Sequence, residues 1–220
     1  MWMEGSTSGV YRMWFQHMDI NRIPFYQYNT IIVGTGAAGL NAAVTLHKLG
    51  QKNIALITEG RYMGTSRNTG SDKQTYYKMT QCGSEPDSVR KMAKTLFEGG
   101  CVDGDIAMAE AAGSLRAFYH LVDIGVPFPF NKSGEYVGYK TDHDPLKRGI
   151  SAGPLTSKYM TECLERQAEE RGIPFFDGYQ AVRLLTEEKD GEKRAAGIIA
   201  LNKQKAASPD ERYAVFSAVN

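Results

Sequence analysis

The stretch TIIVGTGAAGLNAA, residues 30–43, decides the fold of this chain. A short apolar run ends at Gly34, and Gly36 and Gly39 follow at the offsets of the pattern G-x-G-x-x-G. The apolar run predicts a buried strand, and the alanine-rich stretch after the glycines predicts an amphipathic helix over residues 37–49. A strand that enters a helix through so tight a turn is typical of a βαβ unit.

The segment NIALIT, residues 53–58, predicts a second buried strand after that helix. Two strands joined by one helix within about 30 residues form a right-handed crossover, and the strands are then parallel. Glu59 follows the second strand and stands 20 positions after Gly39. An acid at this distance completes the context in which the glycine pattern indicates dinucleotide binding.

Each glycine would have a physical reason in such a site. Gly34 would allow the tight turn, Gly36 the approach of the backbone to a pyrophosphate, and Gly39 the close packing of helix on strand. The helix N-terminus would offer N–H groups and a partial positive charge to the phosphates. Glu59 would accept hydrogen bonds from an adenosine ribose. The alternative is an ordinary βαβ turn that holds no ligand.

The loop after Glu59 favours FAD over NAD as the dinucleotide. In an NAD fold a helix usually returns to the sheet soon after this acid. Here residues 64–71, GTSRNTGS, form a row of small hydrogen-bonding side chains, and residues 59–79 predict a long ordered loop. Arg67 could pair with a phosphate or with a flavin carbonyl. A solvated surface loop is the alternative interpretation.

The later sequence predicts three helices and then four strands. The helices are expected at residues 84–100 with a capping pair of Ser84 and Asp87, at residues 103–125, and at residues 156–172 with Thr156 or Ser157 as cap. The buried face of the second is expected to hold Ile106, Ala109, Ala112, Leu115, Tyr119 and Val122. The strands are expected at residues 173–176, 179–188, 194–203 and 212–220, with a hairpin turn at Asp190 and Gly191. The fold class is therefore α/β, with a parallel sheet and an antiparallel β-meander.

Composition excludes several classes of partner. The formal net charge is +1, which gives no electrostatic case for nucleic acid or an anionic membrane. The three cysteines are odd in number and widely spaced, so we expect a reducing, cytoplasmic location. No apolar run reaches the roughly 18 to 20 residues that span a bilayer. Residues 1–28 predict an N-terminal extension that either packs Trp2, Trp14 or Phe25 onto a domain of residues 29–220 or stays partly loose.

At these residues the chain resembles the family of FAD-dependent oxidoreductases that includes fumarate reductase and succinate dehydrogenase flavoprotein subunits and L-aspartate oxidase. The resemblance is carried by IIVGTGAAGLNAA, ALITEG, GTSRNTGSDKQ, GPLTSKYMTECL and YQAVRLLTEEKDG with AAGIIAL. It implies a Rossmann-like FAD-binding domain. The FAD contacts that it implies are Gly34, Thr35, Gly36, Ala37, Ala38, Gly39, Thr58, Glu59, Gly60, Ser66, Arg67, Asn68, Thr69, Gly70, Ser71, Ala181 and Val182.

The resemblance also implies what the chain lacks. Relatives that attach FAD covalently do so through a histidine in the loop after the second strand, where this chain has Ser66, Arg67 and Asn68, so noncovalent FAD is implied. The family continues with a further strand that ends in an ATGG-like turn, and with a capping domain that brings substrate-binding and proton-donating residues. We therefore expect an incomplete N-terminal portion, inactive alone, whose first strand is left as a sheet edge. Its partners would be the missing C-terminal part, a small-molecule substrate and an electron-transfer protein.

Candidates for chemistry lie in YKTDHDPLKRG, residues 139–149. His143 between two aspartates could shuttle protons or bind a carboxylate, and Arg148 or Lys140 could hold an anionic substrate. A charged surface loop is the alternative. The case for a metal site at Asp142, His143 and Asp144 is weaker than either of these interpretations, because adjacent residues point in different directions. No metal is expected.

The resulting hypothesis is hydride transfer between a flavin and a C–C or C–N bond of a small anionic substrate. Two other hypotheses stay open from the residues alone. One is an NAD(P)-dependent Rossmann dehydrogenase. The other is a non-catalytic remnant that keeps the FAD-binding fold.

Overall fold

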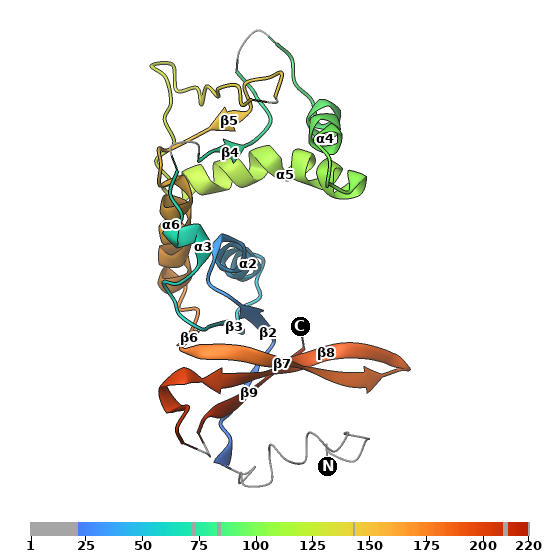
Figure 1. Ribbon diagram of the computed structural model, residues 1–220, viewed down its shortest axis with the longest axis vertical. Coiled ribbons are helices and arrows are strands. Elements are labelled where there is room, and N and C mark those ends of the chain that lie inside the picture. The colour runs from blue at the N-terminus through green and yellow to red at the C-terminus, as the bar shows by residue number, and fades with distance from the viewer. Residues whose placement is uncertain (1–21, 72–73, 83–84, 143, 209–210, 220) are drawn as a thin grey trace. The chain divides into compact units, whose positions relative to one another are not determined.

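The structure is a computed structural model and describes residues 22–71, 74–82, 85–142, 144–208 and 211–219. The chain divides into two compact units, which are described separately. Unit 2 is Thr65–Glu170, and unit 1 consists of the described residues before and after it. Figure 1 traces both along the chain.

Unit 1 contains the predicted βαβ unit, and its parallel sheet is confirmed. The sheet has the order β2-β3-β6, and all of its pairs are parallel. All five residues of β3 are buried, as expected for a strand covered on both faces. Among the described strands, β2 pairs with β3 alone, so it forms the expected edge. The elements of this layer are β2 (Thr30–Val33), α2 (Ala37–Lys48), β3 (Ile54–Thr58) and β6 (Phe175–Asp177).

A second sheet of unit 1 has the order β1-β9-β8-β7 and contains the predicted antiparallel meander. Asp190 and Gly191 join β7 to β8 with φ values of 56° and 77°, which suits a hairpin turn of type I′. Figure 1 shows these two strands as a long twisted ribbon. The elements are β1 (Phe25–Tyr28), β7 (Tyr179–Lys189), β8 (Glu192–Asn202), the short 3₁₀ helix η2 (Lys203–Lys205) and β9 (Tyr213–Ala218).

The N-terminal region contributes a strand where the sequence suggested only an extension. Residues Phe25–Tyr28 form β1 and pair in parallel with β9. The Phe25 side chain is 64% exposed, whereas the ring of Tyr26 stacks on Phe216 with centroids 4.9 Å apart. Trp2 and Trp14 lie outside the described residues. The domain boundary between residues 28 and 29 stays a prediction.

Unit 2 is mainly helical. Its core joins α4 to α5 through Met92, Ala93, Ala107 and Ala111. A two-stranded antiparallel pair, β4 with β5, completes the unit. The elements are α3 (Thr65–Asn68), β4 (Tyr76–Tyr77), α4 (Val89–Glu98), α5 (Gly104–Asp123), β5 (Gly149–Ile150) and α6 (Thr156–Glu170).

The buried face of α5 differs from the predicted one. The expected position Ile106 is 62% exposed, and Tyr119 is exposed as well. The face that packs inward consists of Ala107, Ala111, Ser114, Phe118 and Leu121, and the last four of these stand one residue before a predicted position. Because α5 carries alanine and large apolar residues on both sides, its sequence fits either orientation, and tertiary packing decides between them.

Two other local predictions are corrected. Ser88 caps α4, with its hydroxyl accepting the Lys91 N–H at 3.2 Å, while Asp87 faces other partners and Ser84 lies outside the described residues. The segment after Glu59 is not one continuous loop, because it contains α3 and β4.

The start of α6 is held from elsewhere in unit 2. The side-chain oxygen of Gln74 accepts the Ser157 N–H at 2.9 Å. The hydroxyl of Thr156, the first residue of α6, accepts the Ala152 N–H at 2.9 Å. The two expected capping residues therefore bond at this terminus, but the side chain that accepts from the Ser157 amide is that of Gln74.

We expect Phe216→Ala to destabilise unit 1 strongly. Phe216 is fully buried against Ile57, Ile198 and Ala200, and its loss leaves a cavity between the two sheets. The free energy of unfolding should fall by about 3–5 kcal/mol in urea denaturation. Phe25→Ala, which removes the same ring from an exposed position of β1, should change it by less than about 0.5 kcal/mol. Equal losses in the two variants would contradict this account of the core.

Candidate functional site

The glycine turn between β2 and α2 has the geometry that its spacing predicts. Gly34 has a φ of 101°, a value that glycine adopts without strain, and its N–H donates to the carbonyl of Ile57 at 2.8 Å. A Cβ atom added to Gly39 would lie 2.1 Å from the carbonyl oxygen of Gly34. No side chain fits at position 39 without backbone movement, so the first turn of α2 lies directly against the end of β2.

The N-cap residue of α2 is a glycine, Gly36, which has no side chain to cap the helix. The first turn of α2 contains no acidic residue. Gly64 comes close to the same turn, since a Cβ at Gly64 would lie 3.6 Å from the Cα of Gly36. Small residues on both segments keep large side chains away from the positive end of the helix dipole, an arrangement that suits an anion.

Buried hydroxyls tie this turn to the end of β3. The Oγ1 atoms of Thr35 and Thr58 lie 3.1 Å apart, and both side chains are buried. Thr58 also donates to the carbonyl of Gly60 at 3.3 Å, and Thr35 lies 3.2 Å from that of Arg61. The loops that follow β2 and β3 are therefore held at a fixed distance, as at the carboxyl edge of a parallel sheet where ligands bind.

Glu59 lies at this edge in an exposed ion pair. Its Oε1 accepts from the Lys203 ammonium at 2.8 Å. Nearby, the guanidinium of Arg61 lies 4.1 Å from the ring centroid of Phe175, and the Arg61 N–H donates to Asp177 at 2.8 Å. The predicted sugar-binding carboxylate is thus present, in a setting of cations that the sequence did not indicate.

Val182 lies in a β-bulge of β7. Ala181 pairs with Ala200 and Arg183 with Ile199, so Val182 has no opposite residue in β8. Its side chain is exposed. A bulge removes backbone groups from the ladder and makes them available to a ligand.

The predicted contacts in residues 66–71 belong to unit 2 and are held there by α6 and the turn before it. Arg67 forms ion pairs with Glu165 and, at 3.5 Å, with Glu162, both on α6. The Thr69 hydroxyl donates to the Thr65 carbonyl at 2.9 Å, and the Ser71 N–H donates to Pro154 at 3.0 Å. The segment is ordered by its own unit, and its contact with a ligand stays a prediction.

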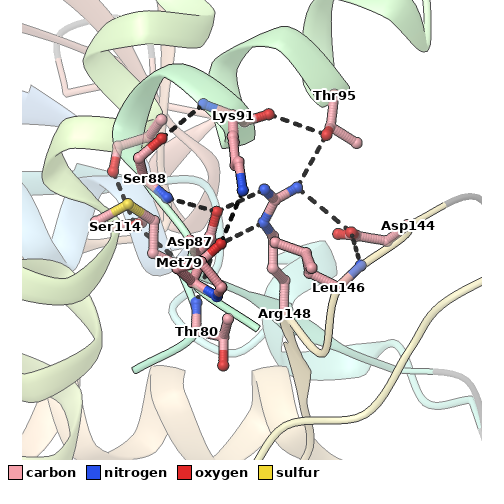
Figure 2. A network of polar contacts seen from close by, with 12 residues as sticks. Met79, Thr80, Asp87, Ser88, Lys91, Thr95, Ser114, Asp144, Leu146 and Arg148 are labelled. Carbon is pink, nitrogen blue, oxygen red and sulfur yellow. Dashed lines mark hydrogen bonds and ion pairs between the residues drawn. The ribbon is translucent and has the colours of Figure 1, made fainter. Parts of the chain in front are cut away.

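Arg148 is fully buried in a polar network of unit 2 (Figure 2). Its Nε and Nη2 donate to the two carboxylate oxygens of Asp87 at 2.9 and 2.7 Å. Its Nη1 donates to the hydroxyl of Thr95 at 2.9 Å and lies 3.3 Å from Asp144. The Tyr77 hydroxyl bonds to both Arg148 and Asp144. The guanidinium therefore joins the segment before β5 to β4 and α4.

This enclosure shifts the pKa values of the network. Burial raises the pKa of Asp87, but hydrogen bonds from Arg148 and from the amides of Thr80 and Ser88 outweigh burial and lower it. Burial and the bond to Asp144 raise the pKa of Tyr77 to about 12. At neutral pH the network holds an ionised aspartate, a neutral tyrosine and a charged arginine. His143 lies outside the described residues, so its predicted role is untested.

The described residues contain neither a metal-binding cluster nor a membrane-spanning helix. They contain no group of three or more histidine, cysteine or acidic side chains arranged to hold a metal ion. None of the helices within them has the length and apolarity that a membrane span requires.

Gly39→Ala should destabilise the chain, whereas Gly113→Ala should not. Both glycines lie in helices, but a Cβ at Gly113 would meet nothing within 4 Å. Alanine at 113 should raise the free energy of unfolding by about 0.5–1 kcal/mol through helix propensity. Alanine at 39 should lower it by about 1–3 kcal/mol, because the backbone of Gly34 must move. A stabilising effect at both positions in urea denaturation would refute the close packing of α2 on β2.

Arg148→Met should destabilise the chain by about 3–5 kcal/mol, because it leaves Asp87 and Asp144 buried without a counter-charge. Arg194→Met breaks an exposed pair with Glu192 and should cost less than about 0.5 kcal/mol.

Arg148→Met should also change the pH dependence of stability. The lowered pKa of Asp87 contributes stability above its unfolded pKa near 4, and this is lost as the pH falls through the folded pKa. Wild-type stability should therefore fall between about pH 5 and pH 3, and Arg148→Met should flatten that slope. An unchanged slope would show that Arg148 does not set the ionisation of Asp87.

Comparison with known proteins agrees with the geometry of unit 1. Residues 29–218 match the family model described as FAD binding domain. The chain is 29% identical over 195 residues to L-aspartate oxidase of Pseudomonas aeruginosa, a match that covers 81% of this chain and 34% of that protein. It is 33% identical over 179 residues to the 8-methylmenaquinol:fumarate reductase flavoprotein subunit of Wolinella succinogenes, covering 80% of this chain and 29% of that subunit.

Solved structures share the fold. A variant of FrdA from E. coli quinol fumarate reductase superposes with a TM-score of 0.73 at 20% identity, over 89% of this chain and 32% of that one. Sdh1 of Mycobacterium smegmatis gives 0.75 at 17% identity, over 89% and 33%. The chain spans about a third of the length of the relatives it matches. The family match favours the flavin interpretation over an NAD(P)-dependent dehydrogenase. The chain belongs to the FAD binding domain family, and its cofactor is FAD.

Proposed function

We propose that the chain is the FAD-binding portion of an oxidoreductase that transfers hydride between the flavin and a small anionic substrate. The observation that carries the proposal is the glycine turn before α2, in which the N-cap residue is Gly36 and Gly39 packs the helix closely against β2. The matched relatives are named for aspartate and fumarate, both small dicarboxylates, and they are oxidoreductases, which favours an enzyme over a non-catalytic remnant.

The residues of unit 1 fit an extended dinucleotide. The amides of Gly36, Ala37 and Ala38 would bind the diphosphate, and Glu59 would accept hydrogen bonds from the ribose. The bulge at Val182, together with Ala181, would offer backbone groups to the adenine. When bound, the flavin supplies the hydride chemistry, and the protein supplies binding and orientation.

Residues 66–71 are proposed as further FAD contacts, as the resemblance implies. They are Ser66, Arg67, Asn68, Thr69, Gly70 and Ser71, and none is a histidine, so the proposed attachment is noncovalent. His143 is proposed as a proton carrier. Arg148 has its donors directed at protein acceptors, so we assign it a positioning role for the segment that contains Asp144. Electron-transfer partners would be further proteins, as the word subunit in the Wolinella protein's name suggests.

The purified 220-residue chain should bind FAD in equilibrium dialysis, weakly and reversibly. Gly36→Asp should weaken binding at least about tenfold, because a carboxylate at the N-cap repels the diphosphate while it satisfies the helix. Ser88→Asp places the same side chain at the N-cap of α4 and should leave binding unaltered. Acid precipitation should release all flavin into the supernatant.

Two results would contradict the proposal. One is a folded chain, by circular dichroism, that retains no FAD at millimolar concentration. The other is flavin that stays with the precipitated protein, which would overturn noncovalent attachment.

A further inference from the structure

We propose that Lys203 is a positioning residue for FAD, and that it acts by holding Glu59 in the orientation that binds the adenosine ribose. This inference rests on the proposed function, since it assumes that Glu59 contacts the sugar. Lys203 comes from η2, 144 residues after Glu59, and no pattern in the sequence connects the two.

The two carboxylate oxygens of Glu59 differ in their hydrogen-bond partners. Oε1 accepts from the Lys203 ammonium at 2.8 Å, whereas no described residue hydrogen-bonds to Oε2. Both side chains are about half exposed, at 43% for Lys203 and 44% for Glu59. One oxygen is therefore fixed by the protein, and the other stays open to a hydroxyl donor.

The second observation is that the backbone of Lys203 is fixed. Its N–H donates to the Gly178 carbonyl at 2.8 Å, in the connection between β6 and β7. Asn202 caps η2 by accepting the Gln204 N–H at 3.1 Å, and its own side-chain amide donates to the Tyr179 hydroxyl at 3.1 Å. The Lys203 side chain is thus attached to a turn that hydrogen bonds hold in place, rather than to a free loop.

The ion pair with Lys203 should lower both the entropic cost and the charge repulsion of binding FAD. A free glutamate side chain at a loop must be ordered when it binds a sugar, and an ion pair that already orders it removes part of that cost. The cation also offsets the repulsion between the carboxylate and a ligand that carries a diphosphate. Because exposed ion pairs contribute little, we expect an effect of about three- to fivefold on the dissociation constant.

The test compares two lysines of the same turn. Lys205 forms an exposed pair with Glu211 at 3.0 Å, so Lys205→Met removes a similar interaction that does not involve Glu59. Dissociation constants for FAD would be measured by equilibrium dialysis at low salt. Lys203→Met should raise the constant about three- to fivefold, Lys205→Met should leave it unchanged, and Lys203→Arg should restore most of the affinity.

A double-mutant cycle shows whether Lys203 acts through Glu59. In the Glu59→Gln background, Lys203→Met should have no further effect, because the carboxylate it orders is gone. The effect of Lys203→Met should also shrink as salt is raised to about 1 M, since salt screens exposed pairs. If Lys203 had a merely structural role, the effect of Lys203→Met on the dissociation constant would persist in the Glu59→Gln background and at high salt.

Several results would overturn the inference. Tighter binding by Lys203→Met would show that the lysine competes with the ribose, and equal losses with Lys205→Met or in the Glu59→Gln background would show that it does not act through Glu59. In each case wild-type binding of FAD, and its loss in Gly36→Asp, would leave the proposed function intact. Absence of binding by the wild-type chain would reject both.

Discussion

The contact between Gly39 and the Gly34 carbonyl is the constraint on which unit 1 depends. It brings helix and strand backbones so close that a single methyl group does not fit. This approach determines where α2 begins, and so where its amides and its dipole point. The hydroxyls of Thr35 and Thr58 then hold the next loop at a fixed distance from that helix end. Main-chain geometry, rather than any reactive side chain, is thus the basis on which we propose that this edge binds a diphosphate.

Unit 2 relies on a different kind of interaction. Its small apolar core between α4 and α5 is supplemented by the buried guanidinium of Arg148, which bonds to Asp87, Thr95 and Asp144 (Figure 2). Such a network adds little net stability compared with apolar packing, but it tolerates only one arrangement of its members. It therefore specifies how the segment before β5 lies against α4, a task that the irregular sequence of residues 126–148 could not achieve by hydrophobic contacts alone.

The sequence predicted those features of the fold that residues close together in the chain determine. Gly34, Gly36 and Gly39 lie within six positions, and Asp190 with Gly191 forms a turn by itself, so the βαβ unit and the hairpin were both found. Features that depend on contacts between distant segments, such as the buried face of α5, were not predicted correctly. Both sides of α5 carry apolar residues, and only packing against α4 distinguishes Ala107 from Ile106.

Charged residues were the least predictable part of the site. Arg148 in a polar segment suggested an exposed or substrate-binding side chain, because nothing local reveals that Asp87, 61 residues away, neutralises it. Lys203 gave no signal for the same reason. The backbone part of a dinucleotide site repeats from protein to protein and leaves a pattern in the glycines, whereas the side chains that adjust it come from distant segments. It follows that substitution in the glycine turn disturbs the packing of α2 on β2, whereas the pair of Glu59 and Lys203 is exposed, so salt screens it and substitution can alter it without disturbing the fold.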